Sequence, residues 1–84
     1  MTAEQALLEQ TRLLIERLER ISVDSVWARR SSGHRGALLK WIQRLESPDG
    51  QVHVELSKKE LQVLETLIGT GFQFLEKAAR DRFL

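Results

Sequence analysis

The chain of 84 residues has no cysteine, a single proline and no long apolar run. The absence of cysteine excludes disulfides and thiol chemistry, so a metal site would have to use His34, His53 and carboxylates. No apolar stretch approaches the roughly 18 residues of a membrane-spanning helix, and the first residues lack the basic and apolar regions of a secretory signal. We therefore expect a soluble, cytoplasmic protein with no cofactor and no membrane partner.

An excess of charge of one sign is also missing. Thirteen Lys and Arg residues stand against 12 Asp and Glu residues, which gives a net charge of +1. This balance does not require nucleic acid or an anionic membrane as a partner. The hydrophobic fraction of 42% excludes a disordered chain, and 84 residues suffice for one small domain. The core of such a small domain is marginal, so we expect self-association.

Two helix starts have the spacing of a capping box. Thr2 is followed by Gln5, and Ser57 by Glu60, each pair just before a run rich in leucine. In a capping box the hydroxyl accepts from a backbone N–H three residues on, and the longer side chain reaches back to the first residue. These pairs therefore predict the beginnings of a first and a last helix.

The middle helix has a less certain course. Ser22 is its expected N-cap, with Asp24 near the positive end of the helix dipole. The stretch from Ser31 to Gly36 contains weak helix formers, which could break the helix. The apolar residues on both sides of this stretch nevertheless share one helical phase, which favours a single helix, with or without a kink, over two.

Together these patterns predict an all-α fold in one domain over residues 1–84, arranged as a small three-helix bundle. The expected helices cover about residues 3–20, 23–46 and 58–82. Ser47-Pro48-Asp49-Gly50 has the composition of a turn. Residues 51–56 alternate polar and apolar as in a strand. Because a lone strand has no partner in this chain, this extended segment is either a connector or half of an intermolecular pair.

The apolar stripe of the last helix is wide enough to contact both other helices or a second chain. Val63, Leu67 and Phe74 lie at the flank of this stripe. Exposed together, they would form an apolar patch of the kind that marks an interface. We expect them to form the interface of a homodimer. Gly71 lies within the stripe, where a missing side chain permits close approach of another helix.

A basic cluster in the middle helix is the only polar group of residues that suggests a binding site. Its members are Arg29, Arg30, His34 and Arg35. Arginine forks bind phosphate and other anions, whereas a solvated helix face is the alternative. In a continuous helix, Arg30 and His34 would fall on the apolar stripe between Trp27 and Trp41. A buried charge there would need a carboxylate, a bound anion, or a break in the helix that releases it to water.

No nucleophile, metal cluster or phosphate loop accompanies these features. A lone histidine near arginines lacks the partners of general acid–base catalysis, so we do not expect an enzyme. The sequence predicts a non-enzymatic protein–protein interaction module that acts by helix packing. Binding of nucleic acid or another anion through residues 29–35 is the alternative. Salt distinguishes the two, because phosphate contacts weaken steeply with ionic strength.

Overall fold

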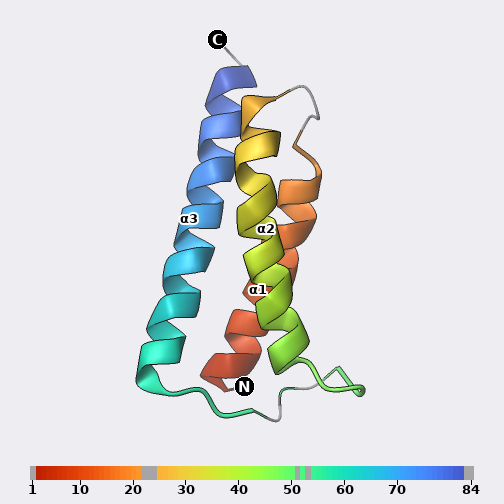
Figure 1. The fold of residues 1–84 in the computed structure, drawn as a ribbon, viewed down its shortest axis with the longest axis vertical. Helices are drawn as coiled ribbons and strands as arrows, with labels where there is room; N and C mark the ends of the chain where they lie inside the picture. The colour runs from red at the N-terminus through yellow and green to blue at the C-terminus, as the bar shows by residue number, and fades with distance from the viewer. Residues whose placement is uncertain (1, 22–24, 51, 53, 83–84) are drawn as a thin grey trace.

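A computed structural model describes residues 2–21, 25–50, 52 and 54–82, and these residues form three α-helices and no strand. The helices are α1 (Ala3–Glu19), α2 (Val26–Leu45) and α3 (Lys58–Arg82). α2 runs back alongside α1, and α3 returns in the direction of α1 (Figure 1). Each helix contacts the other two. The predicted all-α three-helix bundle is confirmed.

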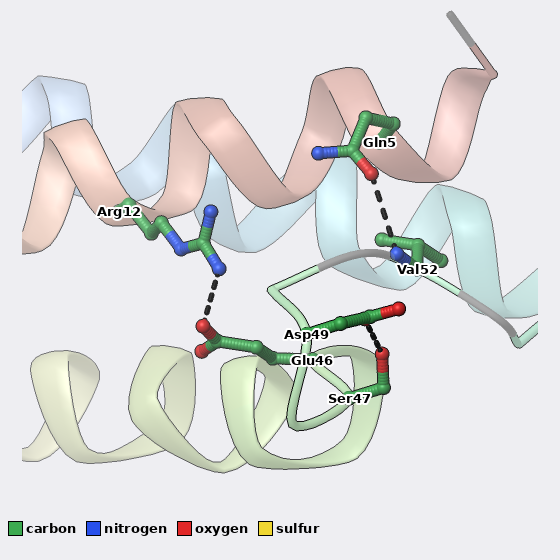
Figure 2. A network of polar contacts seen from close by, with 6 residues as sticks. All are labelled: Gln5, Arg12, Glu46, Ser47, Asp49 and Val52. Carbon is green, nitrogen blue, oxygen red and sulfur yellow. Dashed lines mark hydrogen bonds and ion pairs between the residues drawn. The ribbon is translucent and has the colours of Figure 1, made fainter.

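α1 begins where the capping pair predicts it, but only half of the capping box forms. Oγ1 of Thr2 accepts from the backbone N–H of Gln5 at 3.1 Å. The side chain of Gln5 does not reach back to Thr2. Its Oε1 accepts instead from the backbone N–H of Val52 at 3.3 Å (Figure 2). Gln5 thus ties the segment before α3 to the first turn of α1.

α2 is one continuous helix through the stretch from Ser31 to Gly36, as the apolar phase predicted. Its start differs from the prediction. Ser25 is the N-cap, in extended conformation, and its side chain accepts from the backbone N–H of Trp27. Ser22 and Asp24, the expected start signal, lie outside the described residues. The Ser25 hydroxyl thus caps α2 by accepting a hydrogen bond from the backbone N–H two residues further along the chain.

The turn after α2 follows the predicted chemistry. The backbone N–H of Gly50 donates to the carbonyl oxygen of Ser47 at 2.8 Å, and Gly50 has a φ of +79°, which favours glycine. An isolated antiparallel bridge pairs Glu46, just before this turn, with Val52, just after it. Gln51 and His53 lie outside the described residues. Where it is described, the segment 51–56 is therefore a connector with a single bridge.

An ion pair links the turn to α1. Nη2 of Arg12 lies 2.5 Å from Oε1 of Glu46, at the end of α2 (Figure 2). Arg12 and Gln5 of α1 thus hold the two sides of the connecting loop, next to the bridge. Both Arg12 and Glu46 are more than a third exposed, so this pair contributes at most about 1 kcal/mol.

α3 begins with a complete capping box, as predicted. The N–H of Glu60 donates to Oγ of Ser57 at 3.2 Å, and the N–H of Ser57 donates to Oε1 of Glu60 at 3.1 Å. Arg44 of α2 also pairs with the Glu60 carboxylate. The hydrogen bond from the Ser57 backbone, aided by Arg44, lowers the pKa of Glu60 below its ordinary value of 4.5.

The core lies along the inner faces of all three helices. Among the described residues ten apolar side chains are buried, half of them from α1: Leu7, Leu8, Leu14, Ile15, Leu18, Leu38, Leu45, Leu56, Leu64 and Ile68. Gly71 allows α1 and α3 to approach, because a Cβ there would lie 2.4 Å from Cδ2 of Leu14. The close approach expected at Gly71 is confirmed. Within the described residues, no helix is long and apolar enough to cross a membrane.

Candidate functional site

His34 lies at the contact between α2 and α3. Its Nε2 is 2.5 Å from the backbone carbonyl oxygen of Leu67, and its ring centroid is 5.6 Å from that of Phe74. Because a carbonyl oxygen only accepts hydrogen bonds, Nε2 carries the proton in this contact. The half-buried histidine therefore uses a backbone group of the same chain in place of a carboxylate or an anion.

Arg30 is exposed, so the prediction that it lies on the core side of α2 is wrong. Its Cζ lies 4.9 Å from the centroid of the Trp27 ring. The buried residues of α2 follow each other at steps of seven: Ser31, Leu38 and Leu45. At about 100° per residue, Arg30 is about 80° away from Leu38 around the helix. The predicted apolar stripe included Val26, and this residue shifted the centre of the stripe toward Arg30. In the structure Val26 is 50% exposed, so it does not belong to the buried face.

Trp27 receives cations from two helices. Nζ of Lys77 on α3 lies 5.3 Å from the Trp27 ring centroid, in addition to Arg30 from α2. The ring of Phe74 lies 6.1 Å away at an interplanar angle of 58°. Each cation–π contact is worth about 0.5–1 kcal/mol at an exposed site. Trp27 therefore joins the N-terminal end of α2 to the C-terminal part of α3.

The other two arginines of the predicted cluster have different surroundings. Arg29 is exposed and Arg35 is half-buried. Neither is paired with a carboxylate among the residues that the structure describes. Arg29 and His34 are five positions apart, so at about 100° per residue they point about 140° apart and lie on different faces of the helix. The predicted cluster is thus not a single pocket around one anion.

The three residues predicted for a dimer interface do not form one exposed patch. Val63 is 45% exposed on α3. Leu67 and Phe74 are half-buried and pack against the core of the same chain. Phe74 also contacts the rings of Trp27 and His34. A substitution at Phe74 would therefore disturb the bundle itself as well as any surface that it shares with a partner.

The charge of α2 is a feature that whole-chain charge counting misses. The helix has no Asp or Glu and five cations: Arg29, Arg30, Arg35, Lys40 and Arg44. Because the full chain carries +1, the remainder of the sequence carries −4. Arg44 pairs with Glu60 and Arg30 covers Trp27, while Lys40 is exposed on the outer side. Counting the charged residues of each expected helix separately would have identified Lys40 from the sequence as a further candidate for the binding site.

The chemistry available at other positions is limited. Among the described residues, no group of three or more His, Asp or Glu side chains could hold a metal ion. A surface hollow beside the start of α1 is lined by Thr2, Glu4, Val52, Val54 and Glu55. His34 is not in this lining, so the hollow does not join the histidine to a carboxylate.

The arrangement of charge thus offers binding chemistry: an acid-free helix, three of whose cations have no carboxylate partner in the described part of the chain. These are Arg29, Arg35 and Lys40. In comparisons with known proteins, no protein-family model, no curated protein and no solved structure matches this chain.

Proposed function

We propose that this chain is a cytoplasmic, non-enzymatic protein–protein interaction module that self-associates or binds another protein by helix packing. The observation that carries the proposal is the acid-free charge of α2. Arg29 and Lys40 are both exposed on this helix, and neither has a carboxylate partner among the described residues. Such a face is complementary to an anionic helix or surface of a partner.

The charge of the rest of the chain favours a protein partner over nucleic acid. The segments outside α2 carry −4 in total, and exposed carboxylates such as Glu9 and Glu65 lie on the two neighbouring helices. The negative charge outside α2 repels a long polyanion, whereas a compact acidic patch on a protein need contact only α2. A protein that makes roughly 6–10 phosphate contacts on DNA uses more cations than the five on α2.

Binding of nucleic acid or another anion through residues 29–35 is the second candidate. Arg29 and Arg30 are exposed near the N-terminal end of α2, and Arg35 follows less than two turns later. Arginine is suited to bind phosphate by two parallel hydrogen bonds. Fluorescence polarisation with single- and double-stranded oligonucleotides at low salt tests this candidate directly.

The experiment for the main proposal is affinity capture of the native chain and of an Arg29→Glu, Lys40→Glu variant. Both are run at two salt concentrations, with and without nuclease. Capture through the charges of α2 should weaken at the higher salt concentration for either class of partner, so the nuclease separates a protein partner from nucleic acid. We expect a stoichiometric protein partner, including the chain itself, to remain after nuclease treatment and to be lost with the variant. Circular dichroism checks that the variant folds. Partners that the variant retains, or that nuclease removes, would contradict the proposal.

A further inference from the structure

Two exposed lysines of α3 lie on the same side of that helix, next to α2. Lys59 and Lys77 are 18 residues apart, which is about five full turns, so they share one line along α3. Nζ of Lys77 lies 5.3 Å from the centroid of the Trp27 ring, so this line borders α2. The cations of α2 therefore have neighbours of the same sign on α3.

The carboxylates of α3 are placed differently. Glu65 and Glu76 are each two positions from a residue that contacts α2, so they point about 160° away from α2. Glu60 lies on the side of α2, where it pairs with Arg44. α2 itself has no carboxylate. Among the side chains that the structure describes, α2 and α3 thus leave no unpaired carboxylate on the side where they meet.

The outer surface where α2 and α3 lie side by side is here called the α2–α3 face (Figure 1). One edge is the line of Lys59 and Lys77 on α3. The other edge is formed by Arg29 and Lys40, which are 11 residues apart and share one line along α2 after about three turns. All four cations are exposed. The α2–α3 face therefore has positive charge along both of its edges.

Exposed apolar side chains lie between the two edges. Val26 of α2 is 50% exposed and Val63 of α3 is 45% exposed, the two largest values among the large apolar side chains of the described residues. Val63 follows Lys59 by one turn, and Val26 is next to Trp27, which contacts Phe74 of α3. The positions between the valines are occupied by small residues: Gly33, Ala37 and Thr70.

We propose that the α2–α3 face binds an acidic amphipathic helix of another protein. The apolar stripe of this helix packs against Val26 and Val63, and carboxylates on its two flanks reach the cations along the two edges. The inference rests on the proposed function and names the chemistry of the partner. Charge complementarity identifies an acidic partner, since positive charge borders the apolar strip on both sides. The exposed valines favour a protein helix over nucleic acid, because a phosphate backbone offers no apolar surface to cover them.

The dimensions of the α2–α3 face agree with one helix as its occupant. Packed helices have axes about 8–10 Å apart. A helix with its side chains is about 10–12 Å wide, so one helix fills the space between the two edges. Val63 and Phe74 are 11 residues apart, and Phe74 marks the level of Trp27 and Val26. At about 1.5 Å per residue, the valines are separated by roughly 16–18 Å, so the partner helix needs apolar residues over about three turns.

Fluorescence anisotropy with a labelled synthetic helix tests the proposal. The probe is a peptide of about 18 residues with leucine along one helical stripe and glutamate on both flanks of the stripe. In the control peptide lysine replaces every glutamate. We expect the native chain to bind the acidic peptide at low salt and to leave the basic peptide unbound.

Adjacent lysines at the start of α3 provide a matched pair of variants. Lys59→Glu should weaken binding of the acidic peptide about three- to tenfold, because an attractive contact becomes repulsive. Lys58→Glu changes the net charge equally and should leave the affinity unchanged. Lys58 is two positions from Glu60, which pairs with Arg44, so it points about 160° away from α2. Lys40→Glu tests the opposite edge and should weaken binding as Lys59→Glu does.

Val63→Ser separates a packed helix from attraction by charge alone. It leaves every charge in place and removes an exposed apolar side chain that the core of the chain does not need. We expect it to weaken binding of the acidic peptide about fivefold. An oligonucleotide bound by the same cations should not respond to this change. Circular dichroism checks that each variant keeps its helices.

The outcomes separate this inference from the proposed function. No binding of the acidic peptide, equal losses with Lys58→Glu and Lys59→Glu, or an unchanged affinity with Val63→Ser would overturn the docking of an acidic helix. If affinity capture still yields a charge-dependent protein partner in that case, the interaction module stands with a second copy or a partner of another shape. If capture fails as well, both proposals fall. If oligonucleotides bind more tightly than the acidic peptide through the same lysines, binding of nucleic acid replaces both.

Discussion

Replacement of Gly71 by alanine tests the closest contact between α1 and α3. A Cβ at this position would lie 2.4 Å from Cδ2 of Leu14 and 3.1 Å from its Cγ. Leu14 is fully buried, with 0% of its surface exposed. A shift of the Cδ2 methyl group alone would leave the short Cγ contact in place. The two helices must therefore separate, or Leu14 must move within a filled core.

Gly69 provides a matched control two residues away in the same helix. Nothing lies within 4 Å of the position that its Cβ would occupy. Alanine is favoured over glycine in a helix by about 1 kcal/mol, so Gly69→Ala should raise the free energy of unfolding by that amount. Gly71→Ala has the same gain in helix propensity, but overpacking against Leu14 lowers the free energy of unfolding by about 1–3 kcal/mol. It should therefore be about 1–3 kcal/mol less stable than Gly69→Ala.

Urea unfolding followed by circular dichroism measures this difference, at a protein concentration where sedimentation shows one species. For a domain of this size the difference corresponds to a Tm lower by about 4 °C or more. Leu14→Ala costs about 2–5 kcal/mol on its own, and it should cost less in the Gly71→Ala chain because the new Cβ fills part of the cavity. Equal stabilisation by both glycine substitutions would refute the close contact.

Four further features give measurable predictions. Ser57→Ala should lower the free energy of unfolding by about 1 kcal/mol in urea, since α3 loses its N-cap. Because the pKa of Glu60 is lowered in the folded state, its ionised carboxylate stabilises the fold above pH 4.5. This stabilisation is lost as the pH falls through the pKa of the folded state. Glu60→Gln should accordingly reduce the loss of Tm in acid. Arg30→Ala should cost about 0.5–1 kcal/mol in urea through its contact with Trp27, and Arg29→Ala almost nothing. Amide hydrogen exchange should be faster in the N-terminal half of α2 than in its C-terminal half, because only Ser31 is buried in the former.

The starts of α1 and α3 could be predicted from the sequence because their capping signals are local. Ser57 and Glu60 satisfy each other's backbone groups without help from any other part of the chain. The turn at Gly50 is local in the same sense, since its carbonyl partner, Ser47, is three residues away. The continuity of α2 was predictable because the apolar phase on both sides of the glycines depends only on helical spacing.

The failures occurred where a partner distant in sequence decides the outcome. The side chain of Gln5 could complete its capping box, but Val52 offers a backbone N–H that competes for the same oxygen. The position of Arg30 depends on how α2 is rotated against its neighbours. An error of one residue in the centre of the stripe turns a side chain by about 100° and converts a buried arginine into an exposed one. The carbonyl partner of His34, on Leu67, is likewise visible only in the packed structure.

The two halves of α2 differ in what stabilises them. Leu38 and Leu45 anchor the C-terminal half in the core, whereas the N-terminal half buries Ser31 and otherwise relies on half-buried contacts of Trp27 and His34 with α3. Glycines at 33 and 36 each cost about 1 kcal/mol relative to alanine, and no close packing within the described chain offsets that cost. A partner on the outer face would therefore add contacts to the middle of α2. This region adjoins the N-terminal half of the helix, which has fewer contacts within the chain than the C-terminal half. Association and the local stability of α2 are then linked, because a partner that binds only the folded helix also suppresses its local opening.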